Sequence, residues 1–489
     1  MRRLQIPVVA ALMSVVAAVA AAQDAGPTLS LDDAVRMALQ RNKNLKVVSY
    51  YRGISRASLL VARGRFDPAF VLNRSAMDSP EQLNPGVAQV YTFREDTYSA
   101  GLGGQTPLGT TYSINAQILN QRYSIYGYGN NYMTYAGFSV TQPLLKGFGF
   151  AANLQNVRIS KANRGISDLQ YRQSAIDTVT NVVIAYSNLQ LAHDVLAAAR
   201  RSRDAASSLL EANEKQYKVG SISQSDVTTA RFNVASQEES ILIAERSVRD
   251  RQNQLRELIG DDVFLEDEPL FTLVPVQVPE VTVDLRADLT RALALRPDYQ
   301  QARLGIAKNR AVEAAARNGI LPQVDFVGGY GYNGLGSTLS ASRQQVEQKD
   351  NPSYSAGLQV TIPLTFAVGR GNLRAARLTR EQSEEDMKRL EADIAVSVAN
   401  AAGQIETTRK RVVADRAAYA LAKLALEAEE KKKLVGTSTT LAVVQQQQFV
   451  SAQEINVSFA LANERQAVAN YDQQLGTTLD RFHISLASE

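Results

Sequence analysis

Apolar residues recur along the chain at two spacings, and each spacing predicts a different kind of element. Helical spacing marks six stretches, at residues 31–63, 151–217, 225–259, 285–317, 372–434 and 440–475. The stretch 151–217 has 67 residues and no proline. As one helix it would be about 100 Å long, which no globular domain accommodates. We therefore expect long helices that pack side by side through alanine-rich faces.

Strict alternation of apolar and polar residues marks shorter stretches between these helices. They lie at residues 66–77, 93–104, 110–121 and 132–142, and again at 323–332 and 354–363. Strands of this length with one apolar and one polar face are typical of a membrane β-barrel. Eight of the 19 tyrosines fall between Tyr91 and Tyr135, which favours an aromatic belt at a membrane interface over a soluble β-sandwich. An isolated coiled-coil rod, the other alternative, would lack the strands.

The same plan occurs twice in the chain. Ala38-Leu39 matches Ala292-Leu293 and Pro68 matches Pro322, both at an offset of 254 residues. Later matches keep the order, as Val219-Gly220 and Gly260 correspond to Val435-Gly436 and Gly476. We predict an export segment at 1–22, a first copy at 23–260, a linker at 261–283, a second copy at 284–476 and a tail at 477–489.

The two copies differ in their strands. Each set of strands leaves from a helix and returns to a helix on the same side, so its number must be even. The second copy has two predicted strands joined by the polar loop 334–351, and the first has four, with a turn at Thr106-Pro107-Leu108-Gly109. One chain supplies too few strands to close a barrel, so several copies must share one.

The first 22 residues predict export. Arg2 and Arg3 precede a short apolar run at 8–20, and small residues at 20–22 fit a cleavage site. The run is short for a membrane anchor, and no second run of about 18 apolar residues stands out. Without this segment the chain has 51 of its 53 basic residues and 49 acidic ones. This near balance of charge does not favour a nucleic-acid partner. The chain has no cysteine, which excludes disulfides and a lipid anchor on an N-terminal cysteine.

No pattern indicates an enzyme. Gly147-Phe148-Gly149-Phe150-Ala151-Ala152 fits a dinucleotide-binding loop, but Asp168 then falls within a long helix instead of after a second strand. The two histidines, His193 and His483, have no cysteine beside them to complete a common zinc site. We therefore expect no catalytic residue, no metal and no cofactor. Pro143, Gly147, Gly149, Pro363 and Gly369 are instead expected to form the strand-to-helix junctions.

These features together resemble the TolC family of outer membrane efflux proteins. The resemblance is carried by the doubled plan, by the opening residues Leu29-Ser30-Leu31-Asp32-Asp33-Ala34, by Gln142-Pro143-Leu144, and by the turns Lys218-Val219-Gly220-Ser221 and Leu434-Val435-Gly436-Thr437. It implies an α+β membrane protein of two tandem repeats, with a long α-helical hairpin tunnel and transmembrane strands contributed to a shared trimeric β-barrel. The family usually has two strands per repeat, so either this barrel is wider or one hairpin lies elsewhere.

The resemblance also implies a role. Members are the outer membrane exit ducts of tripartite efflux pumps or of type I secretion systems, working with a periplasmic adaptor and an inner-membrane transporter and surrounded by outer membrane lipid. The adaptor contact falls on the tips, at Val219, Gly220, Ser221, Val435, Gly436 and Thr437. The plainer interpretation of both glycines is that they end helices. A stand-alone porin, the alternative function, would lack the long helices.

The closable entrance is where the sequence departs from its relatives. Asp226 matches a gate aspartate, but Ser438, Ala442 and Gln445 stand where some relatives have an arginine and two aspartates, and Lys433 replaces a tyrosine. We expect Asp226 to pair with Lys433 or Lys432 and hold the entrance shut. The tract 445–448 consists of glutamines, which either line the pore or form a solvated helix face.

Overall fold

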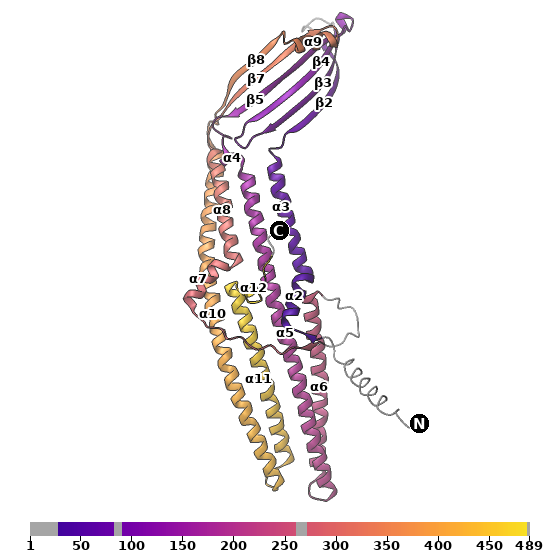
Figure 1. Ribbon diagram of the computed structural model, residues 1–489, viewed down its shortest axis with the longest axis vertical. Helices are drawn as coiled ribbons and strands as arrows, with labels where there is room; N and C mark the ends of the chain where they lie inside the picture. Colours follow the sequence, from indigo (N-terminus) through magenta and orange to yellow (C-terminus); the bar gives the residue numbers. More distant parts are fainter. Residues whose placement is uncertain (1–27, 83–89, 261–270, 487–489) are drawn as a thin grey trace, which may run out of the picture. The chain divides into compact units, whose positions relative to one another are not determined.

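The computed structural model describes residues 28–82, 90–260 and 271–486 (Figure 1). The predicted export segment and residues 261–270 of the predicted linker lie outside the described residues. The chain divides into two compact units, each built from both sequence copies. One comprises residues 51–168 and 301–388, and the other comprises residues up to 50, 169–300 and from 389 onwards.

The first unit holds a single antiparallel sheet of six strands. Its strands are β2 (Ala69–Gln82), β3 (Val90–Gln105), β4 (Thr111–Tyr123), β5 (Asn131–Pro143), β7 (Gln323–Gly336) and β8 (Pro352–Thr361). They lie in this order across the sheet, as Figure 1 shows, so the sheet runs from one copy into the other where β5 pairs with β7. Within the described residues, β2 and β8 each keep one edge without a strand partner.

The pairing register gives the sheet two unlike faces. One row of directly paired residues crosses all six strands as Phe70, Leu102, Ile114, Phe138, Tyr330 and Tyr354. The neighbouring row on the opposite face reads Val71, Gly101, Asn115, Gly137, Gly331 and Ser353. Every member of the first row is exposed in the single chain. An apolar face of this breadth fits lipid, as the alternating pattern predicts.

Four helical segments in the same unit lie at one end of the sheet (Figure 1). They belong to α3 (Lys43–Gly64), α5 (Gln155–Lys218), α8 (Pro297–Asn318) and α10 (Ala367–Leu434). A short helix, α4 (Phe150–Asn153), precedes α5. Part of α5 is apolar enough by composition and length to cross a membrane, but more than half of that window is buried inside the protein, as in a core helix. This window mixes apolar residues with polar ones, so it does not contradict the expectation that no second run of about 18 apolar residues exists.

The second unit is helical around two apolar cores. It contains α2 (Leu31–Arg41), α6 (Gln224–Ile259), α7 (Leu285–Leu295), α11 (Thr440–Leu475), α12 (Thr478–Arg481) and the remaining parts of α3, α5, α8 and α10. One core centres on Tyr186 and Leu189 of α5, and the other on Ile394, Ile405 and Tyr471. These side chains are almost completely buried, so their removal from water stabilises the packing of the helices.

An extended segment, which is the described part of the predicted linker, crosses these helices. The short strands β1 (Thr28–Leu29) and β6 (Thr272–Leu273) pair in parallel, and irregular chain follows as far as α7. The Tyr186 hydroxyl lies 2.9 Å from the carbonyl oxygen of Leu29 and 2.8 Å from that of Val274. Arg465 of α11 donates to the Val276 carbonyl at 3.0 Å. This extended segment is thus attached to both α5 and α11.

Two predicted helices are each split in the structure. The stretch 31–63 divides into α2 and α3 at Asn42, whose side-chain oxygen accepts from the Leu45 amide while its side-chain nitrogen donates to the Leu258 carbonyl. The stretch 285–317 divides into α7 and α8 at Arg296, because Pro297 disfavours helical geometry in the residue before it. Ser30 caps the start of α2, since its hydroxyl oxygen accepts from the Asp33 amide.

The loop between β7 and β8 is also more ordered than predicted. It contains the helix α9 (Leu339–Gln348), which packs on β7 and β5. Ser342 of α9 is buried and donates to Thr134 at 2.7 Å. Strand ends shift from the predicted ends by a few residues at most positions, with β7 extending to Gly336.

Candidate functional site

The two helical hairpins of the second unit end in turns of the same geometry. Gly220 lies between α5 and α6 with φ 78°, and Gly436 lies between α10 and α11 with φ 79°. In each turn the glycine amide and the next amide bond back to helix carbonyls, Ser221 to Gln216 and Thr437 to Lys432. This arrangement satisfies the free carbonyls of the ending helix and needs a left-handed residue. The glycines are therefore genuine helix stops.

The tips also present apolar side chains to solvent. Val219 is 76% exposed, Leu434 79% and Val435 75%. Exposed valine and leucine side chains at the end of a helix do not stabilise the isolated chain, because they remain in contact with water. They form a small apolar surface on each hairpin, at the residues expected to contact an adaptor.

Asp226 is engaged in capping its own helix. Its carboxylate accepts from the Ser223 amide at 3.2 Å and from the Ser223 hydroxyl at 2.7 Å, while the Ser223 hydroxyl oxygen accepts from the Asp226 amide. This is a reciprocal capping box at the start of α6. The hydrogen bond from Ser223, with smaller contributions from Thr440 and the charge of Lys433, holds the pKa of Asp226 below its usual value.

A buried asparagine connects the two hairpins. Asn213 of α5 has no exposed surface, and its side-chain oxygen accepts a 2.6 Å hydrogen bond from the Lys433 ammonium of α10. Its side-chain nitrogen is 3.3 Å from both the Thr440 hydroxyl of α11 and the Asp226 carbonyl of α6. One amide thus touches all four helices near the tips. We name Asn213, Lys433, Thr440 and Asp226 the tip clasp.

The predicted ion pair is replaced by this clasp. Among the described residues no ion pair joins Asp226 to Lys433 or to Lys432, because the Asp226 carboxylate serves the cap and Lys433 reaches Asn213 instead. Lys432 pairs with Glu429 on its own helix at 3.1 Å. Burial lowers the pKa of Lys433, and the charge of Asp226 opposes that shift. Gln445 is exposed on α11, and no hydrogen bond ties its side chain to another described residue.

Asn213 was not singled out from the sequence, although a signal was present. It lies seven residues after Ala206, which follows Ala199 and Ala192 at the same spacing, and all three alanines are buried. Asn213 therefore continues a seven-residue core stripe with a polar residue. A buried asparagine in such a stripe typically fixes how neighbouring helices align.

The junction of the first copy bends at the predicted glycines. Gly147 has φ 85° and Gly149 has φ 90°, just after β5 ends at Pro143. The Asn153 side chain donates to the carbonyls of Gly147 and Gly149, and Asn318 of α8 accepts from the Gly147 amide at 2.7 Å. Two asparagines therefore satisfy the polar backbone of the bend.

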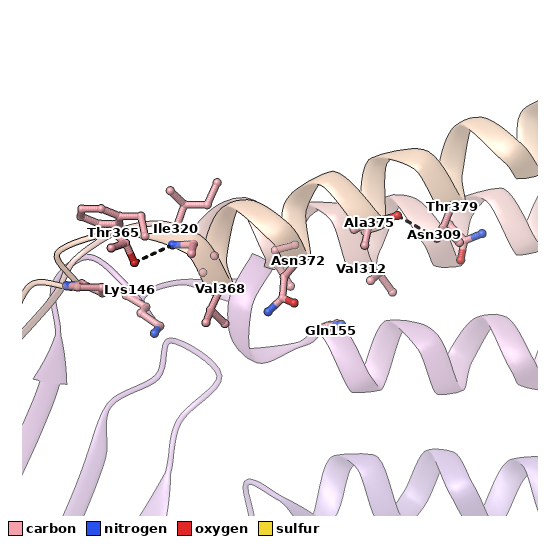
Figure 2. A pocket seen from close by; sticks show the side chains of 18 residues that line it. Lys146, Gln155, Asn309, Val312, Ile320, Thr365, Val368, Asn372, Ala375 and Thr379 are labelled. Atoms are coloured by element: carbon pink, nitrogen blue, oxygen red, sulfur yellow. Dashed lines mark hydrogen bonds between the residues drawn. The ribbon is translucent and has the colours of Figure 1, made fainter.

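The junction of the second copy is built differently. Pro363 follows β8, but the left-handed residue there is Phe366, with φ 51°, and not Gly369. Gly369 lies in the first turn of α10, where an added Cβ would be 3.1 Å from the Gly319 carbonyl oxygen. Its lack of a side chain therefore suits the close approach of α10 to the turn that follows α8. A cavity of about 640 Å³ lies beside it, lined by α8, α10 and Lys146, as Figure 2 shows.

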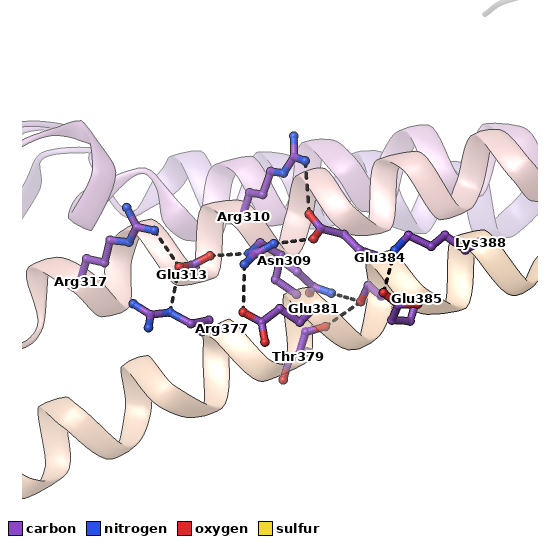
Figure 3. Close-up of polar contacts among 12 residues, drawn as sticks. Asn309, Arg310, Glu313, Arg317, Arg377, Thr379, Glu381, Glu384, Glu385 and Lys388 are labelled. Atoms are coloured by element: carbon purple, nitrogen blue, oxygen red, sulfur yellow. Dashed lines mark hydrogen bonds and ion pairs between the residues drawn. The ribbon is translucent and has the colours of Figure 1, made fainter.

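Charged residues bind α8 to α10 beyond this cavity (Figure 3). The Glu313 side chain is only 6% exposed and accepts from Arg317 and Arg380, both at 2.8 Å, with Arg377 3.8 Å away. Arg380 also pairs with Glu384 and Glu381. Hydrogen bonds from Arg317 first and Arg380 next hold the pKa of Glu313 below its ordinary value. We refer to these residues as the Glu313 network.

The arrangement has no recognisable catalytic centre in the part of the chain that the structure describes. No cluster of metal-binding side chains occurs there. Asp168, the acid of the rejected dinucleotide pattern, lies within α5 and pairs with Arg52 at 2.9 Å. Burial lowers the pKa of His193. Its buried Nε2 atom has no hydrogen-bond partner among the described residues.

Comparison with known proteins agrees with the duplicated plan. The sequence profile described as outer membrane efflux protein matches residues 34–261 and again 289–477. The outer membrane protein TolC of Escherichia coli is 22% identical over 352 residues, covering 70% of this chain and 66% of its own length. The pyoverdine export outer membrane protein OpmQ of Pseudomonas putida is 24% identical, covering 65% and 64%. The matched part of this chain thus spans just under two thirds of these relatives.

Solved structures share the fold over a larger part. The outer-membrane channel OprN superposes with a TM-score of 0.69 at 16% identity, over 91% of this chain and 89% of its own. CusC gives a TM-score of 0.69 at 18% identity, over 91% and 92%. The outer membrane channel CmeC of Campylobacter jejuni gives 0.66 at 16% identity.

Proposed function

Because the chain belongs to the outer membrane efflux protein family, we propose that it is the outer membrane exit duct of a tripartite efflux pump or of a type I secretion system. Three copies enclose a β-barrel in outer membrane lipid and a helical tunnel in the periplasm. The tunnel receives cargo from an inner-membrane transporter through a periplasmic adaptor. The protein moves solutes or proteins and performs no chemistry on them.

One observation carries this proposal above the others. In the described residues, a six-stranded sheet with an exposed apolar face and two unpaired edges occurs together with helices of 64 and 68 residues. The apolar face requires lipid, and the free edges require other strands. The long helices exclude a plain porin, and the sheet excludes a rod. The named relatives support the same role, since one is a pyoverdine export protein and another an alkaline protease secretion protein.

The tip surfaces are the proposed adaptor contact. Val219 and Val435 stand beside the glycines Gly220 and Gly436, around which no atom would obstruct even an added Cβ. Another helical hairpin can therefore approach the turn backbone closely. The apolar side chains then gain burial that they lack in the free protein.

The tip clasp is the proposed closure of the entrance. It joins the hairpin α5–α6 to the hairpin α10–α11 through one buried amide and one ammonium group. A hydrogen bond to a charged group contributes roughly 1.5–3 kcal/mol. That is strong enough to bias the tips towards one arrangement and weak enough for adaptor binding to overcome.

The test is isolation of the full-length protein from the outer membrane fraction. We expect a detergent-resistant trimer that gives ion conductance in planar lipid bilayers, and loss of export when the gene for this chain alone is deleted. A monomeric protein found free in the periplasm would overturn the proposal. Trimers that conduct ions but support no export would favour the alternative function, a stand-alone porin, over the proposed one.

A further inference from the structure

The extra strands of the first copy can be identified by comparing the copies. Pro68 and Pro322 precede β2 and β7, and the motifs around Pro143 and Pro363 follow β5 and β8. The first strand of each copy is therefore β2 or β7, and the last is β5 or β8. The additional hairpin is β3–β4, inserted between them.

This hairpin has the same two faces as the strands on either side. Leu102 of β3 and Ile114 of β4 continue the apolar row between Phe70 and Phe138. On the opposite face Ser113 and Ser139 are joined by a 2.8 Å hydrogen bond. A hairpin that lay outside the barrel wall would have no reason to match both faces, because the side-chain period fixes which face each residue occupies.

The turn of the hairpin is also anchored to the strand-to-helix junction. The Leu108 carbonyl accepts from the Gly149 amide at 2.9 Å, and Gln105 donates to Asn153 at 3.2 Å. Gly109 packs so closely that an added Cβ would be 2.3 Å from the Gly147 carbonyl oxygen. Asn153, which holds the junction bend, therefore also holds the inserted hairpin.

The two edge strands of the sheet that includes this hairpin can pair with each other between two copies of the chain. Strand direction alternates across six strands, so β8 of one copy and β2 of another meet antiparallel. The helices that continue from these strands carry exposed apolar side chains, Ile54 and Val61 on α3 and Val368 and Leu378 on α10. Apolar flanks beside both free edges favour a second copy of this chain as the neighbour.

We propose that all six strands of each copy enter one barrel wall, with β8 of one copy paired to β2 of the next. This inference rests on the proposed function for the number of copies, and three copies then give an eighteen-stranded barrel. Barrel diameter grows roughly linearly with strand number. The barrel is therefore about one and a half times as wide as one in which each copy contributes only four strands.

Engineered disulfides test the seam directly, since the natural chain has no cysteine. Ser355→Cys in β8 is combined in turn with Leu72→Cys, Asn73→Cys, Arg74→Cys or Ser75→Cys in β2. We expect at least one pair to give covalent dimers and trimers that reductant dissolves, because facing strands bring Cβ atoms within disulfide range. Absence of a crosslink from every pair in conducting trimers would overturn the inference.

A second pair tests whether the hairpin lies in the wall. Leu72 and Ala136 belong to the same row, with β3 and β4 between them, about 14 Å apart at ordinary strand spacing. The variant Leu72→Cys with Ala136→Cys should form no disulfide within a chain. Efficient formation of one would mean that β2 pairs with β5 and that the hairpin has left the barrel.

The width is measured by polymer exclusion. Deletion of residues 83–123 removes the hairpin and leaves 124–130 to join β2 to β5. We expect this variant to exclude smaller polyethylene glycols from the extracellular mouth than the natural protein does, and an unchanged cut-off would contradict the inference. Failure of the proposed function looks different, because seam crosslinks would then form in a protein that conducts no ions.

Discussion

The ammonium group of Lys433 lies 2.6 Å from the side-chain oxygen of Asn213, which is fully buried between the helices near the tips. The two residues are 220 positions apart and belong to different copies of the repeat. The contact joins two hairpins that have no covalent connection at this end. The contact therefore stabilises the association of the two hairpins and not the folding of either hairpin alone.

Removal of the clasp amide should open the entrance. Asn213→Ala leaves Lys433 and Thr440 without their shared partner, which weakens the closed arrangement by about 1–3 kcal/mol. We expect the open probability, and with it the mean conductance, to rise about tenfold, and Lys433→Ala to act similarly. The double variant should exceed neither single variant by much, because both remove the same contact.

Lys432→Ala is the matched control for this prediction. It removes a lysine next in sequence whose ion pair with Glu429 stays within α10. We expect its conductance to equal that of the natural protein. If Asn213→Ala and Lys432→Ala behaved alike, the clasp would have no part in closure.

A buried carboxyl in α11 should make stability depend on pH. Burial raises the pKa of Asp472 to about 6, although the Arg481 guanidinium beside it acts in the opposite direction. Between about pH 4 and pH 6 the folded carboxyl keeps a proton that the unfolded one loses. The free energy of unfolding therefore falls as pH rises through this window.

The side chain of Asn in Asp472→Asn does not titrate, so the free energy of unfolding of this variant should rise relative to that of the natural protein as pH rises. The expected change in the stability difference is about 3 kcal/mol between pH below 4 and pH above 6. Thermal unfolding of detergent-solubilised protein at both pH values measures it. Asp480→Asn, which alters an exposed carboxyl of the neighbouring α12, should leave the difference constant.

Much of this fold follows from periodicity and repetition. The helices of 64 and 68 residues, the six strands and the capping residue Ser30 all leave local signals in the sequence. The split at Arg296 was also visible, because Pro297 follows it. The split at Asn42 was not, since its side chain acts partly through a carbonyl 216 residues away.

The candidate site was less predictable for the same reason. The glycines at the tips follow from turn chemistry and repeat in both copies. The clasp depends on which helix faces meet, so the sequence led to an ion pair between Asp226 and a lysine. The Asp226 carboxylate instead forms a local capping interaction with Ser223, because the two residues are only three positions apart in the sequence.

The junction should not tolerate a side chain at Gly109. This residue has φ 99°, and an added Cβ would lie 2.3 Å from the Gly147 carbonyl oxygen and 2.8 Å from the Asn153 side chain. Gly109→Ala should cost about 1–3 kcal/mol from backbone strain alone. We expect the trimer to dissociate at lower temperature on unboiled gels. Gly129→Ala, whose Cβ would come no nearer than 3.6 Å to another atom, should be neutral, and equal losses from both variants would contradict this view.

The Glu313 network should stabilise α8 against α10 only while its carboxylate is charged. Hydrogen bonds from Arg317 and Arg380 hold the pKa of Glu313 below its ordinary value. The stabilisation is therefore present above the ordinary pKa of a glutamate and is lost as pH falls through the lowered value. Glu313→Gln should lower the melting temperature at pH 7 and differ less from the natural protein as the solution becomes acidic.

Glu381→Gln provides the comparison, since Glu381 is half-exposed and contacts only Arg380 among the arginines of the network. We expect a much smaller change, because an exposed ion pair contributes little. Melting curves of both variants at pH 7 and pH 4 decide the matter. A Glu313→Gln deficit that persisted unchanged at pH 4 would show that shape, and not charge, accounts for the contact between α8 and α10.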